Sequence, residues 1–426
     1  MKYLCKARLF LPIMIFTILV SVPLFWIFLE ENVSVISRIE NRSLVAFPSL
    51  TFRDFKTAVK RILQARPEEA NQLFFGQFLD RSFQQNIEKA ASDQFPVRLD
   101  LINIAKWVDR EVISLAYSFL SDPAIPADRT TGFFVMRDKS LLIMGPVRFT
   151  QDTRMVIDER IENYAALIEK YPEINFYVYN IQLLQASEYY PMNPYFSDAD
   201  QGQGLEYFEN NMPDGLFLGK MTLSSMEDYV YHFYRTDHHW NIYGILRGYN
   251  EIHDLLARNY SDMTPALIPE RYVTFPDIQF TGSLARKSFY YLSEEFEVAE
   301  FDFPPFVIVE DGKEITQNHF AAYLRGDYQT TPYLNQYGMF YGSDKALLDY
   351  VSENGSERNL LIIGSSFANP LEPLLASHYF HTYSVDLRHY TDFSFSQFIS
   401  EHPVDDVLIL GDNPVSFSSD KWIINP

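Results

Sequence analysis

The sequence has almost no cysteine and little basic charge for its length. Its 426 residues include one cysteine, Cys5, so the chain can form neither an intramolecular disulfide nor a cysteine-based metal site. Lys and Arg number 35 against 56 Asp and Glu, which gives a formal net charge of −21. Nucleic-acid binding needs clusters of Lys and Arg that neutralise phosphates, so we expect no nucleic-acid partner. The acidic residues are spread along the chain, which is typical of a solvated surface.

Internal repeats and low-complexity tracts are also absent from the sequence, whereas apolar residues are plentiful. Hydrophobic residues make up 47% of the chain and aromatic residues 16%, enough for a sizeable core. The 28 Tyr and 36 Phe fit either core packing or stacking on sugar rings, and core packing is the favoured interpretation. The length allows two or three average domains, or one large domain with insertions.

The longest run without charge is at the N-terminus, over residues 9–29. At about 1.5 Å per residue, a helix of this length spans the roughly 30 Å hydrocarbon core of a membrane. Three basic residues precede the run and two acidic residues follow it. The positive-inside rule therefore predicts a cytoplasmic N-terminus, with the bulk of the chain outside the cell.

A cleaved signal peptide is the alternative for this segment. It would need a shorter apolar region and a small-x-small cleavage site, and "FWIFLEEN" at 25–32 contains no such site. We therefore predict that residues 1–31 form a cytoplasmic stub and an uncleaved transmembrane signal anchor. The predicted localisation is the cell membrane, single-pass, with an extracellular main part.

The remainder divides into two regions by pattern. Residues 32–130 are charged and mostly helical, which predicts a stalk or cap, and residues 131–426 alternate between strand and helix patterns, with an insertion at about 260–335. Alternation of this kind predicts an α/β fold with a central, mainly parallel sheet and helices on both faces. We expect strands at 174–180, 360–363, 381–385 and 406–410, and helices at 153–171, 242–259, 346–351, 373–379 and 395–400.

The stretch "LLIIGSSFANP" at 360–370 runs from a buried strand into two serines. Gly364 is a natural end for the strand, and parallel sheets bind ligands at the carboxyl ends of their strands. A hydroxyl at this point is either a nucleophile or part of a polar turn. The choice depends on whether the chain supplies a base, because serine is a poor nucleophile until one takes its proton.

Such a base is available in "YRTDHHWNIYG" at 234–244, before a helix that Asn241 would cap. An imidazole is a general base near neutral pH, and a carboxylate fixes its tautomer and stabilises the imidazolium. Asp237 and a histidine two residues later would supply both groups from one loop.

Two other interpretations of this loop stay open. The adjacent histidines can be ordinary capping or packing residues. His232, Asp237, His238 and His239 can also form a zinc site, since neutral imidazole is a common zinc ligand. Adjacent residues seldom direct both rings at one ion, and the sequence has no HExxH motif. We therefore expect no metal and no other cofactor.

Together these stretches resemble the DHHW protein family, whose signature matches Asp237-His238-His239-Trp240. Further matching pieces occur in order over nearly the whole predicted outer part. They are "ENRSLVAFPSL" at 40–50, "DQFPVR" at 93–98, "FTGSLAR" at 280–286, "FYGS" at 340–343, "GSSFANPLEPLLASHY" at 364–379 and "VDLRHY" at 385–390. The DHHW family is similar to the SGNH hydrolase-like proteins, in the group with the alginate O-acetyltransferases.

The resemblance implies a catalytic set of Ser366 as nucleophile, His239 as base and Asp237 behind it. Ser365 stands where the related motif usually has Asp or Thr. The substrate-binding residues implied are Trp240 and Arg388. For the oxyanion, the resemblance implies the backbone N–H of Ser366, and Gly342 and Asn413 are further candidates.

The activity implied is O-acetyl transfer or O-acetyl ester hydrolysis on a cell-envelope or exported polysaccharide. A membrane protein that supplies the acyl group would be a further partner. Because fold alone does not settle function, a catalytically inactive carbohydrate-binding or assembly protein on the same fold is the alternative. The sequence does not distinguish transfer from hydrolysis.

Overall fold

The computed structural model describes residues 36–37, 42–45, 82–95, 98–120, 126–129, 133–138, 140–288, 292–310, 312–315 and 335–424. The chain divides into two units, Met1–Asp109 and Arg110–Pro426. The predicted membrane segment at 9–29 lies outside the described residues. Within the described ranges, no helix is both long enough and apolar enough to cross a membrane.

The described part of the first unit contains a small hairpin and helical segments. Strands β1 (Ile36–Ser37) and β2 (Arg42–Ser43) pair in antiparallel fashion, and helix α5 covers Ser82–Asp93. The carboxylate of Asp93 accepts a hydrogen bond from the backbone of Val45 at 2.9 Å. This bond ties the segment after the hairpin to the end of α5. Helix α6 (Arg98–Leu120) begins in this unit.

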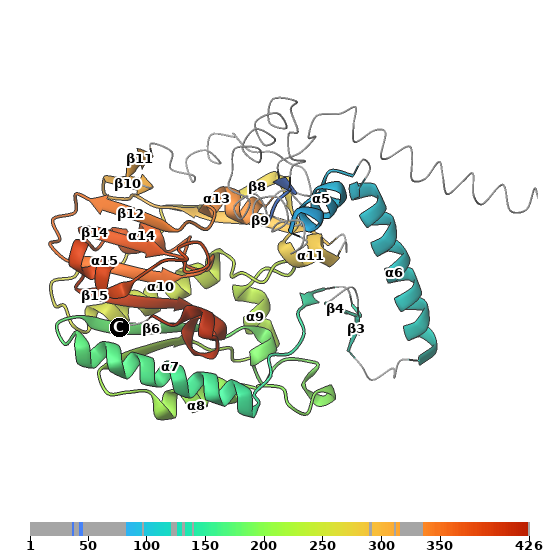
Figure 1. Cartoon of the computed structure of the whole chain (residues 1–426), viewed down its shortest axis with the longest axis horizontal. Coiled ribbons are helices and arrows are strands. Elements are labelled where there is room, and N and C mark those ends of the chain that lie inside the picture. The colour runs from blue at the N-terminus through green and yellow to red at the C-terminus, as the bar shows by residue number, and fades with distance from the viewer. Residues whose placement is uncertain are drawn as a thin grey trace, which may run out of the picture. The chain divides into compact units, whose positions relative to one another are not determined.

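The second unit is built on an eight-stranded sheet in the order β11-β10-β12-β14-β13-β15-β6-β7 (Figure 1). Its strands are β6 (Asn175–Ile181), β7 (Leu216–Met221), β10 (Phe306–Glu310), β11 (Lys313–Ile315), β12 (Leu347–Ser352), β13 (Asn359–Gly364), β14 (His381–Val385) and β15 (Asp406–Gly411). The five strands from β14 to β7 in this order pair in parallel. The sequence runs at 174–180, 360–363 and 406–410 therefore share one sheet, as predicted.

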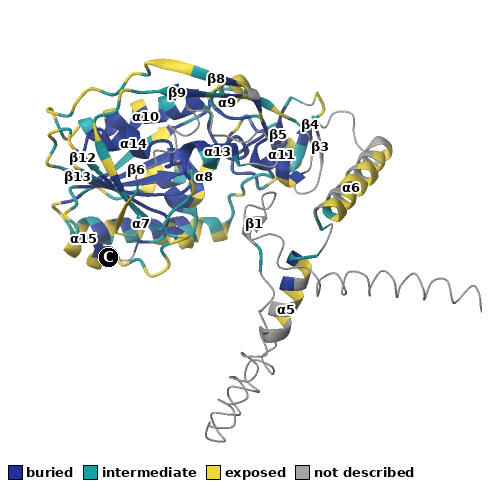
Figure 2. Cartoon of the chain, turned by 90° about the horizontal axis from the view of Figure 1, so that it is seen from above, coloured by how far each residue is buried: buried dark blue, intermediate teal, exposed yellow. Residues whose placement is uncertain are grey.

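Helices cover both faces of this sheet (Figures 1 and 2). Alternate residues of each central strand point to opposite faces, so Ile362 lies in the hydrophobic cluster on one face and Ile363 in the cluster on the other. The helices of the second unit are α7 (Gln151–Lys170), α8 (Gln203–Asn211), α9 (Met226–His232), α10 (Ile242–Ala257), α11 (Ser283–Ser288), α13 (Gln336–Tyr341), α14 (Glu372–Ala376) and α15 (Phe395–Glu401). The predicted α/β architecture with two covered faces is confirmed.

The prediction of a helix at 346–351 is wrong, because this segment forms strand β12. It pairs in antiparallel fashion with β14 and with β10, so the sheet is mixed at this end. The apolar run is too short for its periodicity to distinguish a helix from a strand. The neighbouring strands supply the hydrogen bonds that decide between them.

The segment at 260–335 contributes to more than one element of the unit. Strands β10 and β11 extend the central sheet at its antiparallel end. Strands β8 (Arg271–Phe280) and β9 (Glu294–Glu300) form a separate antiparallel pair.

A three-stranded antiparallel sheet precedes the central sheet in the chain. It comprises β3 (Ala127–Arg129), β4 (Phe134–Met136) and β5 (Leu142–Ile143).

Helix α10 packs its N-terminal half on the fully buried ring of Trp240. The side chain of Asn241 caps the helix by accepting from the backbone N–H groups of Tyr243 and Gly244. One turn further, a Cβ atom on Gly248 would lie 2.5 Å from Cζ3 of Trp240. Glycine at 248 therefore allows the helix to lie directly against the indole ring.

We predict that Gly248→Ala destabilises the protein. Alanine gains about 1 kcal/mol in helix propensity over glycine, but overpacking of a buried ring costs about 1–3 kcal/mol. The expected net loss in the free energy of unfolding is about 1 kcal/mol, measured by chemical denaturation. Asn250→Ala, on the exposed side of the same helix, is the control and should shift it by less than about 0.5 kcal/mol. A Gly248→Ala protein more stable than the wild type would contradict this packing.

Candidate active site

The carboxyl ends of the parallel strands meet at one edge of the sheet. Strand β13 pairs in parallel with both β14 and β15, so the residues that follow these strands emerge on the same side. They include Ser366 after β13, Arg388 after β14 and Asn413 after β15. Asp237 and His239 lie in the loop between α9 and α10.

The chain turns sharply where β13 ends. A Cβ atom on Gly364 would lie 2.8 Å from Cβ of Ala368 and 3.0 Å from the carbonyl oxygen of Leu410. Only glycine therefore fits this close return of the backbone. Ser365 is buried within the turn, whereas Ser366 retains partial exposure.

The structure brings Ser366, His239 and Asp237 into one hydrogen-bonded chain. Nε2 of His239 lies 2.7 Å from Oγ of Ser366, and Nδ1 of His239 lies 2.7 Å from Oδ1 of Asp237. An ionised carboxylate only accepts hydrogen bonds, so Nδ1 carries the proton and Nε2 of the neutral ring is free to accept from the serine hydroxyl. This arrangement can take the proton of Ser366 as the hydroxyl attacks a carbonyl group.

The carboxylate of Asp237 is fully enclosed and receives several donors. Oδ2 accepts from the backbone N–H of Ser283 at 2.5 Å, and Oδ1 accepts from the Ser283 hydroxyl at 3.1 Å. The backbone N–H of His239 also donates to Oδ1, at 3.2 Å. The sequence assigned no role to Ser283. Its only sequence signal was its place within "FTGSLAR", one of the pieces that match the family.

The protonation states of the dyad follow from burial and mutual charge. Burial alone raises the pKa of Asp237, but the neighbouring His239 and His238 outweigh it and hold this pKa well below its usual value. Burial and the neighbouring His238 lower the pKa of His239 to about 4, against the opposing effect of Asp237. An ionised aspartate beside a neutral imidazole is the state that a general base requires.

Aromatic rings hold the imidazole of His239 in place. Tyr337 stacks on it with 4.0 Å between ring centroids and 9° between planes. The ring centroid of Phe367 lies 5.0 Å from that of His239. The hydroxyl of Tyr337 donates to the carbonyl oxygen of Ser366 at 3.1 Å. Tyr337 therefore touches both the base and the serine loop, a role that its sequence context did not indicate.

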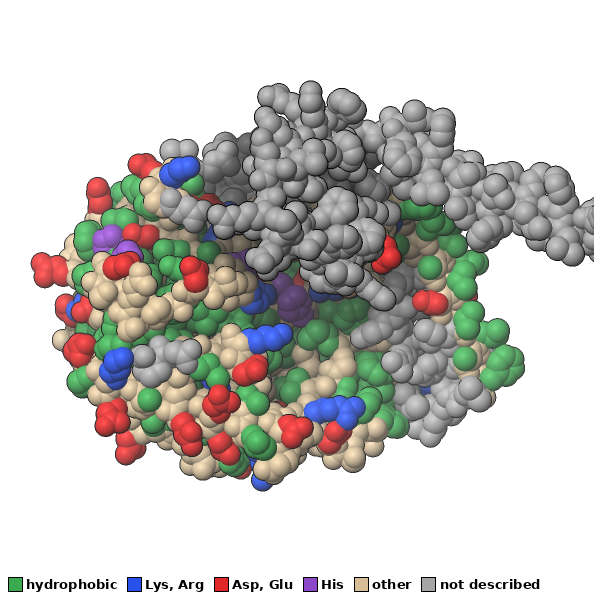
Figure 3. Space-filling view, viewed as in Figure 1, with side chains coloured by type: hydrophobic (Ala, Val, Ile, Leu, Met, Phe, Trp, Pro, Cys, Tyr) green, Lys and Arg blue, Asp and Glu red, His purple; other side chains and the backbone are tan. Residues whose placement is uncertain are grey.

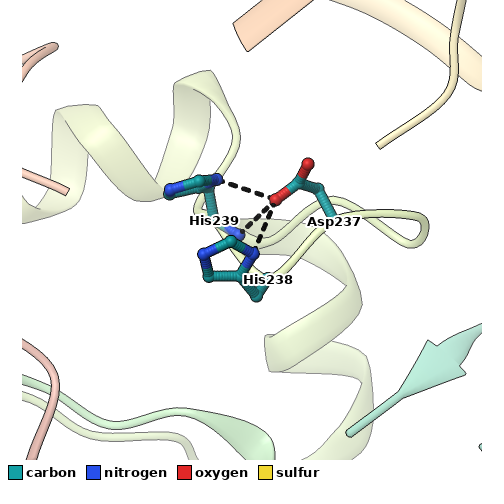
Figure 4. A group of neighbouring side chains, drawn as sticks. All are labelled: Asp237, His238 and His239. Atoms are coloured by element: carbon teal, nitrogen blue, oxygen red, sulfur yellow. Dashed lines mark hydrogen bonds and ion pairs between the residues drawn. The ribbon is translucent and has the colours of Figure 1, made fainter. Parts of the chain in front are cut away.

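His238 lies beside the dyad (Figure 4). Its Nδ1 is 3.0 Å from Oδ1 of Asp237 and 2.8 Å from Oγ of Ser283. Potential metal-ligand atoms of Asp237, His238 and His239 lie within 4.8 Å of one another. Both Nδ1 atoms are at hydrogen-bonding distance from the same carboxylate oxygen, which favours acid–base work over metal binding. His232, the fourth residue of the zinc alternative, instead pairs with Asp228 at 2.8 Å.

Trp240 and Arg388 occupy different surroundings from each other. Trp240 is fully buried, so its ring offers no surface to a substrate. The ring packs against α10 and so fixes the loop that carries the histidines. Arg388 is 44% exposed and binds Asp344 at 2.8 Å and Asp386 at 3.0 Å. Asp344 also accepts from Asn369, in the loop that carries Ser366. Arg388 is thus linked to the serine loop through two side chains.

The two further oxyanion candidates lie near the same edge. The carbonyl oxygen of Gly342 accepts from the side chain of Asn369 at 3.2 Å. Asn413 is buried, and its Oδ1 has no hydrogen-bond partner in the described part of the chain.

Acidic side chains on the visible face of the protein are scattered among other residue types (Figure 3). This distribution agrees with the dispersed acidity of the sequence.

No protein-family model and no curated protein matches the chain. Solved structures do. PatB1 from Bacillus cereus, solved with a sulfonyl adduct, matches at 18% identity over 69% of this chain and 99% of its own, with a TM-score of 0.56. A DHHW family protein from Eubacterium siraeum matches at 17% identity over 69% of this chain and 95% of its own, with a TM-score of 0.53.

A more distant match is the O-acetyltransferase domain of Pseudomonas putida AlgJ, at 11% identity over 68% of this chain and 94% of its own. Its TM-score is 0.37. The two better matches share a fold with this chain at identities too low to carry function. The predicted resemblance is confirmed at that level: the chain is similar in fold to a DHHW family protein and to PatB1.

Proposed function

We propose that the chain is a membrane-anchored extracytoplasmic enzyme that adds or removes O-acetyl groups on a cell-envelope or exported polysaccharide. The observation that carries this proposal is the pair of 2.7 Å contacts that join Ser366 to His239 and His239 to Asp237. The serine and the histidine are 127 residues apart in the chain. Packing alone seldom gathers three such polar side chains, because burying them costs free energy unless each finds a partner.

The mechanism proceeds by acyl transfer. Oγ of Ser366 attacks the acetyl carbonyl carbon while Nε2 of His239 takes the serine proton, and His239 then returns this proton to the departing alcohol. Backbone N–H groups at the serine loop would stabilise the oxyanion, at about 3 kcal/mol per donor. A sugar hydroxyl or water next attacks the acetyl-serine, with His239 again as base.

Two further considerations support this activity. PatB1 has been solved with a sulfonyl adduct, and such an adduct forms on activated nucleophiles. Arg388 lies at the same sheet edge and is partly exposed, so we assign it to substrate binding.

A membrane protein that delivers the acetyl group is the partner that transfer would require. The proposed mechanism uses no metal or other cofactor.

The anchor is a separate part of the proposal and rests on the charge-free run at 9–29. Protease added to intact cells should digest the main part of the chain and spare an N-terminal stub, as detected with an epitope at each end. Complete protection of the C-terminal epitope would contradict the topology. A released chain that begins near residue 30 would contradict the anchor.

The catalytic set predicts a specific pattern of mutant activities. Ser366→Ala and His239→Ala should each lower the hydrolysis of a chromogenic acetyl ester by about 10³-fold or more, and their effects should not add, because the residues act as a unit. Ser365→Ala is the matched control and should keep most activity, since Ser365 is buried in the turn.

The same assay, run with and without EDTA, also tests the metal-free mechanism. Loss of activity in Ser365→Ala but not in Ser366→Ala would move the nucleophile by one residue. Activity that EDTA removes and zinc restores would contradict the prediction that the mechanism needs no metal. Full activity in His239→Ala would refute the mechanism, and a protein without esterase or transfer activity would point to a binding role.

The pH dependence of kcat/KM should report the lowered pKa of His239. The base works in its neutral form, so activity should be present at pH 6 and fall as the pH drops through about 4. An unperturbed histidine would give a midpoint near 6.5. A midpoint at that value in the wild-type profile would contradict the effect of burial on His239.

A further inference from the structure

His238 has an arrangement that packing does not require. Its ring lies against that of His239, with 3.9 Å between centroids and 38° between planes. Both rings direct Nδ1 at Oδ1 of Asp237, and in Figure 4 their other nitrogen atoms point to the same side, away from the carboxylate. The loop therefore presents two imidazole Nε2 atoms side by side.

The hydrogen bonds around Ser283 fix the tautomer of His238. The Ser283 hydroxyl donates to Oδ1 of Asp237, so its oxygen accepts from Nδ1–H of His238 at 2.8 Å. With the proton on Nδ1, Nε2 of the neutral ring is a hydrogen-bond acceptor. No residue in the described ranges hydrogen-bonds to this Nε2, and the side chain is 27% exposed. Support of Asp237 uses only Nδ1, so within the described residues the outer nitrogen is available to a ligand, with the carboxyl group of Asp412 near enough to interact with the ring.

We propose that His238 and His239 together bind a vicinal diol of the acceptor, which makes His238 a specificity-determining residue for the acetyl-transfer step. This inference rests on the proposed function. Two hydroxyl groups on neighbouring carbon atoms of a sugar can each donate to one of two acceptors held side by side. A single alcohol or a water molecule satisfies only one of them.

The two nitrogen atoms have different roles in the step. The first hydroxyl gives its proton to Nε2 of His239 as its oxygen forms the new bond to the acetyl carbon. The bond from that carbon to Oγ of Ser366 then breaks, and Oγ takes the proton back from His239. The second hydroxyl keeps its proton and only donates a hydrogen bond to Nε2 of His238.

A pair of small acceptors tests the proposal without any mutation. The full-length protein is acetylated by p-nitrophenyl acetate, and transfer to 1,2-ethanediol is compared with transfer to 2-methoxyethanol, which differs by a methyl group on the second hydroxyl. After correction for the two equivalent hydroxyls, the wild type should prefer the diol by about three- to tenfold, the effect of one neutral hydrogen bond. Equal rates would overturn the proposal.

Two substitutions separate the inner and outer nitrogen atoms of His238. In His238→Asn the amide nitrogen can replace Nδ1 toward Ser283 but cannot reach the position of Nε2. The initial burst of p-nitrophenol reports the contact of this side chain with Asp237 and is used to normalise the transfer rates. The diol preference, a ratio of two transfer rates, should fall to about one. In His238→Gln the longer side chain can replace Nε2, so part of the preference should return.

The outcomes distinguish this inference from the function beneath it. A wild-type protein that forms no acetyl-enzyme on Ser366 would refute both. An acetyl-enzyme that forms normally but shows no diol preference would refute the role of His238 alone. A His238→Asn protein whose burst and two transfer rates fall in equal proportion would show that His238 only positions Asp237. A His238→Asn protein that keeps the diol preference would show that Nε2 of His238 does not bind the second hydroxyl.

Discussion

The buried carboxylate of Asp237 is the point on which the whole site depends. It accepts from the backbone and hydroxyl of Ser283 and from the backbone and Nδ1 of His239, and Nδ1 of His238 lies 3.0 Å from it. A charge enclosed without such donors would be very costly, so these contacts are what allow it to stay ionised. Because it stays ionised, both rings keep their proton on the inner nitrogen and present the outer one. The loop thereby presents two acceptor nitrogen atoms.

The fold then brings Ser366 to the outer nitrogen of His239. The parallel strands end at a common edge, and the close return at Gly364 aims Ser366 out of the sheet while Ser365 stays inside. The loop with the histidines is held from the other side by Trp240, which packs beneath α10. Tyr337 joins the two halves, since its ring lies on His239 and its hydroxyl reaches the backbone of Ser366. The segment at 260–335 completes the site through Ser283.

Local signals were enough to predict the buried strands and to single out the loops at 234–244 and 364–366, and the family resemblance selected Asp237, His239 and Ser366 within them. The runs at 360–363 and 407–410 are apolar on both faces, as strands in the centre of a covered sheet must be. The run at 346–351 is less apolar and borders the antiparallel end, where hydrogen bonds from distant strands decided its conformation. Ser283 and Tyr337 could not be assigned, because their roles arise from tertiary approach to loops far away in sequence. Trp240 illustrates the same limit, since a motif position does not reveal which side of a loop faces the core.

The central claim is that Ser366 is a nucleophile made reactive by His239. The most direct measurement is peptide mass mapping of the full-length protein after treatment with phenylmethanesulfonyl fluoride. A sulfonyl group on Ser366 that disappears in His239→Ala is the result expected from the 2.7 Å contact between them. A modified Ser365, or modification of Ser366 that persists at the same rate without His239, would contradict the claim.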